Sequence, residues 1–506
     1  MKRSLLTYII IFCSLFPVIL PSTSFGRDSN VATTLIYRPE SPLVCFRILV
    51  HMGSINDPVG KEGLCELTAK TIARGGTQSF TREQIIEKLY PMAATIGANT
   101  DKEITVFIGE VHKDWLDEFY EIFAGLLSNP RFAPSDFERE RNGLINYLQN
   151  TLRGADDEEL GKEVLNDFIY HNHPYGHCNK GTVSGLKSIT LGDVKSFYQK
   201  MFTSDNIHVG LAGGYTKQFL RRIKTDFNNL PTGEATPVQL PNPEQIEDIE
   251  VIIVEKPCQG TAISLGFPID MTRSDKDYCA LLVANSYFGE HRTMGGCLMR
   301  HMRIFRGLNY GDYSYIENFI QDKWSRLPMP NIPRRQQFFS IWIRPVTHQN
   351  RHFALRQAIR ELELLVKDGL TEQQFEVSRQ CVLNNSKLWT QTLSRRLGYK
   401  MDSEFYGIGD FVDKIEDEVS KLTVNDVNAA IKRYLQYKNI KVAMVTDKAE
   451  NLKEDLITNK VSPIHYPKKD IPEDIFVEDN IIERYPLKIN QGKLRIIPAK
   501  TLFAKE

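Results

Sequence analysis

The stretch Gly63-Leu64-Cys65-Glu66-Leu67-Thr68-Ala69-Lys70-Thr71 decides the fold of this chain. An alternating apolar run, Cys45 to Val50, and a turn at Asn56-Asp57-Pro58 come before it, and two consecutive glycines follow it. The alternation predicts a strand, and paired glycines are typical of the end of a helix. The sequence therefore predicts a strand, a loop and a helix, with Glu66 and Lys70 one turn apart on the same helical face.

This layout resembles the metal-binding helix of the pitrilysin/insulinase family of inverted-zincin metallopeptidases. There, two His of a His-x-x-Glu-His motif bind zinc and the Glu is the general base. On that motif, this chain has Glu66 and Lys70 at the His positions and Ala69 at the base. The resemblance puts the last zinc ligand at Tyr147 and the family's helper carboxylate at Glu140.

The residue types at these positions argue against zinc without any reference to the family. Zinc sites use imidazole, thiolate or carboxylate donors, and an ammonium such as Lys70 repels a dication. Alanine at 69 cannot move a proton, and one carboxylate, Glu66, is not a site. We therefore expect no metal or other cofactor in this chain, and an ion pair between Glu66 and Lys70 on a domain helix.

A repeated unit divides the chain into two parts. Thr190-x-x-Asp193 recurs as Thr423-x-x-Asp426, and Asn206-Ile207 recurs as Asn439-Ile440, in both cases 233 residues later. A constant offset through a helix cap and a strand indicates two homologous domains.

The domain boundaries follow from this repeat and from a polar, proline-bearing linker near residues 230–248. We predict an N-terminal domain over 30–240, a C-terminal domain over 246–462 and a surface tail over 463–506. The fold class is α+β. The resemblance implies that each domain packs helices on one face of a mostly antiparallel sheet, and that the pair forms half of a clam-shell.

The N-terminal residues have the pattern of an export signal. Lys2 and Arg3 precede an apolar run, Leu5 to Leu20, and a small-residue segment that ends at Gly26. This predicts a signal peptide over 1–26 and a periplasmic destination. The 63 Lys and Arg balance the 63 Asp and Glu, so charge gives no support to nucleic-acid binding. The scattered cysteines favour buried thiols over a disulfide framework.

The second half contains the segment Arg303-Ile304-Phe305-Arg306-Gly307-Leu308-Asn309-Tyr310. It resembles the family's Arg-x-x-x-Gly-Leu-x-Tyr signature. That resemblance implies that Arg303 and Tyr310 hold the substrate carbonyl and stabilise the oxyanion at a zinc site. The plainer alternative is a solvated arginine at a helix end and a half-buried strand tyrosine, with Gly307 ending the helix.

Four potential metal donors, His171, His173, His177 and Cys178, lie close together in the sequence. They could bind a soft divalent metal. His173-Pro174-Tyr175-Gly176 is itself similar to a loop of the family, however, which favours a cluster of satisfied or solvated side chains.

The resemblance implies a zinc-less subunit of a heterodimeric peptidase. A partner with an intact His-x-x-Glu-His would supply zinc and base, and this chain would supply substrate binding and the oxyanion contacts of Arg303 and Tyr310. The first alternative is an inert peptide-binding or scaffold protein of the same fold. The second is a stand-alone metallopeptidase with rearranged ligands, such as Glu66, Glu140 and the His171 cluster.

Overall fold

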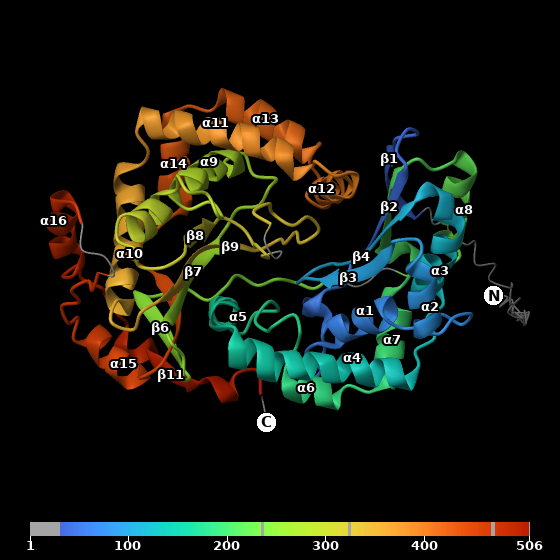
Figure 1. Ribbon diagram of the computed structural model, residues 1–506, viewed down its shortest axis with the longest axis horizontal. Helices are drawn as coiled ribbons and strands as arrows, with labels where there is room; N and C mark the ends of the chain where they lie inside the picture. The colour runs from blue at the N-terminus through green and yellow to red at the C-terminus, as the bar shows by residue number, and fades with distance from the viewer. Residues whose placement is uncertain (1–30, 234–236, 322–324, 467–470, 505–506) are drawn as a thin grey trace, which may run out of the picture.

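The computed structural model describes residues 31–233, 237–321, 325–466 and 471–504 (Figure 1). The expected export signal, residues 1–26, lies outside these ranges. One sheet comes from the N-terminal half of the chain and has the strand order β1-β5-β2-β4-β3. Its strands are β1 Ala32–Tyr37, β2 Leu43–Val50, β3 Thr95–Thr100, β4 Thr105–His112 and β5 Ile207–Gly213.

The second sheet comes from the C-terminal half, with the order β11-β6-β10-β7-β9-β8. Its strands are β6 Ile249–Glu255, β7 Thr261–Ile269, β8 Asp312–Tyr315, β9 Gln337–Val346, β10 Ile440–Thr446 and β11 Arg495–Pro498. Apart from β11, the two sheets match strand for strand. Each has one parallel pair, β1–β5 or β6–β10, and three antiparallel pairs. The predicted α+β fold of two mostly antiparallel domains is confirmed.

Helices surround both sheets. The N-terminal half contains α1 Leu64–Ala73, α2 Arg82–Leu89, α3 Leu116–Ser128, α4 Pro134–Asn146, α5 Asp157–Ile169, α6 Val183–Ser188, α7 Leu191–Met201 and α8 Lys217–Asn228. The C-terminal half contains α9 Tyr278–Phe288, α10 Arg351–Asp368, α11 Glu372–Trp389, α12 Leu393–Phe405, α13 Phe411–Lys421, α14 Val424–Tyr434, α15 Ala449–Ile457 and α16 Glu473–Ile482. Two π-helical segments are η3 Tyr147–Ala155 and η5 Met299–Ile304. Within the described ranges, no helix has the length and apolarity that crossing a bilayer requires.

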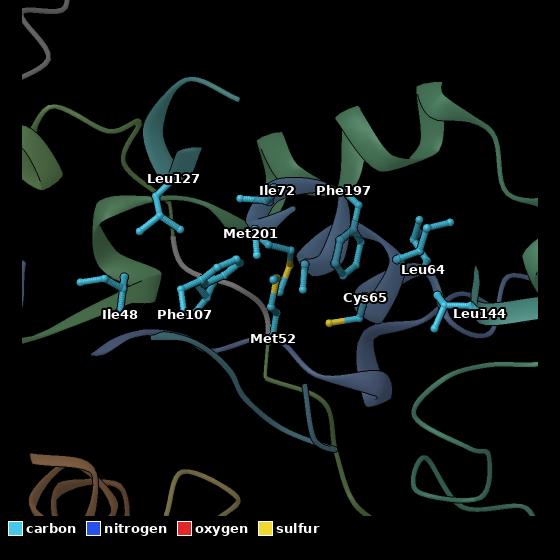
Figure 2. Packing of buried hydrophobic residues seen from close by; sticks show 14 of the residues in the cluster. Ile48, Met52, Leu64, Cys65, Ile72, Phe107, Leu127, Leu144, Phe197 and Met201 are labelled. Carbon is cyan, nitrogen blue, oxygen red and sulfur yellow. The ribbon is translucent and has the colours of Figure 1, made fainter. Parts of the chain in front are cut away.

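The helix α1 is held by its apolar side chains. Leu64, Cys65 and Ile72 belong to the core cluster of the N-terminal domain, together with Phe197 and Met201 of α7. Figure 2 shows these side chains directed into one packed region between the two helices. Because its apolar side chains are fixed in this core, α1 presents Glu66 and Lys70 at a defined place.

Each domain also packs one helix against the sheet of the other. The helix α5 contacts β7 and β10, and α12 contacts β5, β2 and β1 (Figure 1). Along β10, Ala443 and Val445 join the N-terminal core cluster, whereas Val442 and Met444 join the C-terminal one. Since successive strand residues point to opposite faces, the C-terminal sheet is covered on both faces.

The N-terminal sheet follows the same rule. Cys45 and Leu49 of β2 pack with Leu397 and Met401 of α12, while Phe46 of the same strand faces the core of its own domain. The sequence predicts helices on one face of each sheet, but helices cover both faces. Each domain supplies helices to one face of its sheet, and the other domain supplies a helix to the opposite face.

The expectation of a surface tail over 463–506 needs correcting. The strand β11 pairs in parallel with β6 and extends the C-terminal sheet. Beyond it, Ala499 and Phe503 are buried in the core cluster of the N-terminal domain. The tail contains enough apolar residues to add a strand and to fill a core, so it ties the two domains together.

Candidate functional site

Local hydrogen bonds fix the start of α1. The Asp57 carboxylate accepts hydrogen bonds from the backbone N–H groups of Gly63, at 2.8 Å, and Cys65, at 2.7 Å. Nε2 of His177 lies 3.2 Å from Oδ2 of Asp57, and burial raises the pKa of this carboxyl. Because the N-cap residue Gly63 has no side chain, Asp57 takes over its role and orients the helix that follows.

Of the three motif positions on α1, Glu66 and Ala69 are buried, at 7% and 0% exposure, and the side chain of Lys70 is 19% exposed. Nζ of Lys70 lies 3.3 Å from Oε1 of Glu66, so the predicted ion pair is confirmed. The two charges satisfy each other across one helical turn.

The two predicted positions on the later helix have partners of their own. Tyr147 begins η3, Nζ of Lys180 lies 4.8 Å from the centre of its ring, and burial raises the pKa of its hydroxyl to about 12. On α4, Oε2 of Glu140 lies 3.7 Å from Nη1 of Arg74, and its Oε1 accepts a hydrogen bond from Nε of Arg139.

These residues do not fit a zinc ion. Zinc requires several deprotonated donors around one point. Here Glu66 is the one anionic donor among positions 66, 69, 70 and 147, and the ammonium of Lys70 already neutralises it. The Tyr147 phenol keeps its proton at neutral pH, since its pKa is about 12.

A cavity of about 310 Å³ lies between the domains at these positions. Its N-terminal wall comes from α1, the end of β3 and α5, and its C-terminal wall comes from β9 and the segments that precede it. Basic, acidic and aromatic side chains share the lining. The main ones are Glu66, Lys70, Lys102, Lys162, Glu163, Lys180, Arg334, Phe319, Phe338 and Trp342.

The aromatic and basic groups of this cavity are paired across the domains. Nζ of Lys162, on α5, lies 4.0 Å from the centre of the Trp342 ring on β9. Arg334 donates two hydrogen bonds to Asp101, from Nε at 2.8 Å and from Nη2 at 2.7 Å. Both partners of this second pair are buried, at 4% and 0% exposure. The cavity thus has walls of aromatic and charged side chains that are fixed by pairing across the domains.

Arg303 and Tyr310 lie outside this cavity. Arg303 is half-buried in η5, Tyr310 is 77% exposed, and the guanidinium carbon lies 6.0 Å from the centre of the Tyr310 ring. Gly307, with φ of 65°, ends the helix, and Leu308 N–H donates to the carbonyl of Met302 at 3.1 Å. The structure brings the two signature residues together, but not to positions 66, 69, 70 and 147 of the same chain.

The histidine cluster does not converge on one point. His173 Nδ1 accepts a hydrogen bond from the backbone N–H of Tyr175, and His177 pairs with Asp57. Cys178 is buried and His171 is exposed. Within the described ranges, neither this cluster nor the pair Glu66 and Glu140 forms a set of three donors close enough for one metal ion. These side chains therefore make separate contacts or face solvent, although the buried Nε2 of His173 has no well-directed hydrogen-bond partner among the described residues.

Two family models match this chain in succession. Residues 33–177 match the model described as insulinase (peptidase family M16), and residues 188–380 match the M16 inactive domain. The chain belongs to the pitrilysin/insulinase (M16) family. The match to the inactive-domain model spans the start of the C-terminal domain, where Arg303 and Tyr310 lie.

Relatives of this M16 chain include proteins described as peptidases and one described as a non-peptidase. The non-peptidase homologue YmxG of Helicobacter pylori is 22% identical over 459 residues, which are 89% of this chain and all of that protein. An uncharacterised zinc protease of Rickettsia bellii is 23% identical over 57% of this chain and 69% of its own length.

Solved structures give the same fold. The M16 inactive domain from Pseudomonas fluorescens has a TM-score of 0.73 at 20% identity, covering 83% of this chain and 96% of that one. A protease from Helicobacter pylori has a TM-score of 0.70 at 16% identity, covering 83% and 97%. These likenesses show that the chain has the M16 fold.

Proposed function

We propose that this chain is the subunit without a catalytic zinc in a heterodimeric M16 peptidase. A homologous partner with an intact His-x-x-Glu-His would bring zinc and the general base. This chain would bind an unfolded peptide and direct Arg303 and Tyr310 at the substrate carbonyl held by the partner's metal. The pattern of residues 1–26 supports export, and we place the complex in the periplasm.

One observation carries this proposal. Arg303 and Tyr310 lie side by side and partly open to solvent, yet outside the cavity that contains Glu66 and Lys70 of the same chain. A pair that served this chain's own motif would have to line that cavity. A pair that serves another subunit has to be accessible from outside, and Tyr310 is.

Reconstitution with the partner tests the role of the pair. The chain would be purified alone and with an M16 subunit that contains His-x-x-Glu-His, and peptide hydrolysis would be measured for both. We expect activity from the complex, with a loss of about 100-fold in kcat for Arg303→Ala and for Tyr310→Phe. Arg300→Ala, on the same helical turn, is the matched control. Equal activity of the Arg303→Ala and wild-type complexes would rule out the oxyanion role.

A scaffold role is the second candidate, and the description of the Helicobacter pylori relative as a non-peptidase homologue favours it. In that case the inter-domain cavity holds a peptide and no hydrolysis follows. Fluorescence anisotropy with a labelled unfolded peptide separates the two candidates. A scaffold role predicts that the peptide binds and that Trp342→Ala weakens this binding. It also predicts that substitutions at Arg303 and Tyr310 leave the activity of the complex unchanged.

A further inference from the structure

Three metal-binding side chains of different types meet in the C-terminal domain. Cys297 lies in the helical turn directly before η5, His301 lies one turn later within η5, and Glu361 reaches them from α10. One donor atom from each residue lies within 4.8 Å of the others. In the part of the chain that the structure describes, this is the one group of three such donors that converges.

The distances within this cluster are close to those of a metal coordination shell. Sγ of Cys297 lies 3.8 Å from Nδ1 of His301 and 3.5 Å from Oε2 of Glu361, and Oε1 of Glu361 lies 2.9 Å from Nδ1 of His301. With Zn–S of about 2.3 Å and Zn–N or Zn–O of about 2.0–2.2 Å, tetrahedral donors are roughly 3.3–3.6 Å apart. Small side-chain shifts would bring all three donors onto one ion.

Burying these side chains costs free energy when no cation is bound. Cys297 is 6% exposed and Glu361 is 2% exposed. Among the described residues, Oε1 of Glu361 has His301 nearby but accepts no well-directed hydrogen bond. A buried carboxylate oxygen without a directed donor costs free energy, and a bound cation would remove that cost.

We propose that Cys297, His301 and Glu361 bind one divalent metal ion of the zinc class. Thiolate and imidazole donors select zinc over magnesium or calcium, which prefer oxygen ligands. One thiolate, one carboxylate and one neutral imidazole balance the two positive charges of the ion. Binding displaces the thiol proton to solvent, and water takes the fourth position on the side of His301, whose side chain is 26% exposed.

Because of where this site lies, a bound metal would also fix the structure around it. The ion would join η5 and the helical turn before it to α10, and His301 lies two residues before Arg303. A π-helical segment departs from regular helix geometry and is often found at functional sites. The metal would hold that segment in place, so Arg303 would be presented in a fixed position. This inference requires no partner subunit and stands apart from the proposed peptidase role.

Metal titration of the whole chain tests the site. Chelator-treated protein would be titrated with Zn²⁺ by calorimetry, and Co²⁺ would serve as a spectroscopic probe of thiolate coordination. We expect one equivalent of Zn²⁺ and a thiolate-to-cobalt charge-transfer band. Since even second-shell changes lower metal affinity about 10- to 100-fold, Cys297→Ser and Glu361→Gln should each lower it at least about 100-fold.

Cys381→Ser, which changes a half-buried thiol on α11, is the matched control and should leave metal binding unchanged. Glu361→Gln keeps the shape of the side chain, and circular dichroism would verify the fold of each variant. If the wild-type chain takes up no Zn²⁺, or if folded Glu361→Gln and Cys297→Ser bind it as well as wild type, the proposal is wrong.

Discussion

The two halves of the molecule share a fold but differ in the chemistry that they display. Apart from the added strand β11, both sheets have the same strand order, and β5 and β10 lie 233 residues apart at both ends. In the N-terminal half, an ion pair and a methyl group occupy the motif of the family. In the C-terminal half, Arg303 and Tyr310 stay accessible. Packing maintains the fold in both halves, and the site residues vary independently of it.

The largest effect should come from the contact that joins the halves. Arg334→Ala leaves Asp101 buried without its charged partner, and loss of one member of a buried ion pair costs about 3–5 kcal/mol. Chemical denaturation would measure the free energy of unfolding. Arg335→Ala is the comparison variant: its side chain is 45% exposed, and Glu103 keeps hydrogen bonds from the Tyr175 hydroxyl and the backbone N–H of residue 335, so we expect a smaller loss. Equal losses for both variants would refute the account of the interface.

A single glycine tests how α12 sits on the N-terminal sheet. A Cβ at Gly210 would lie 2.4 Å from Sδ of Met401 and 2.9 Å from the carbonyl oxygen of Arg47. Its counterpart in β10 is Ala443, which the C-terminal sheet accommodates. We expect Gly210→Ala to destabilise the chain by about 1–3 kcal/mol through overpacking. Gly97→Ala, where a Cβ meets no atom within 4 Å, should cost far less; a neutral Gly210→Ala would contradict the close approach.

The edge strands of the two sheets should respond differently to pH. Asp312 of β8 is fully buried, and burial raises its pKa from 3.8 to about 8, while β3 contains no carboxylate. Because the folded state binds the proton more tightly, stability is fully present below pH 3.8 and is lost as pH rises to about 8.

Asp312→Asn removes this dependence. Since one pKa unit corresponds to about 1.4 kcal/mol, the variant should gain several kcal/mol over the wild type as pH rises through that window. Thermal unfolding at a series of pH values would measure the difference. A constant difference between the two proteins across the window would show that Asp312 is ionised throughout.

The smallest effects should be equal in the two halves. The hydroxyl of Thr190 accepts a hydrogen bond from the N–H of Asp193 at 3.2 Å, and Thr423 accepts one from Asp426 at 3.3 Å. Thr190→Ala and Thr423→Ala should each cost about 1 kcal/mol, as expected for loss of an N-cap. A denaturation series on both variants would sharpen the comparison, and a severalfold difference between them would mean that the two caps are not equivalent.

Local signals were sufficient for much of this architecture. The predicted capping boxes at Thr190 and Thr423 are present, and the offset between them continues through β5 and β10. The ion pair of Glu66 and Lys70 also follows from helical spacing alone. Ser135-Asp136-Phe137-Glu138 also has the pattern of a capping box, but Ala133 is the N-cap of α4 and Pro134 takes the first position of the helix.

Contacts between distant parts of the chain could not be predicted in this way. No sequence pattern shows that α5 and α12 pack on each other's sheets, or that Phe503 enters the N-terminal core. The approach of Glu361 to Cys297 spans 64 residues and depends on how α10 lies beside η5. Asp57 likewise caps α1 from a preceding turn, which the sequence shows only as a turn.

The central claim is that the motif on α1 and η3 cannot hold zinc, so any hydrolysis depends on the metal of another polypeptide. Anomalous scattering at the zinc edge, from crystals of the chain alone grown with Zn²⁺, tests this directly. We predict no zinc between residues 66, 70 and 147, with Lys70 paired to Glu66. A zinc ion coordinated by those residues would contradict the account.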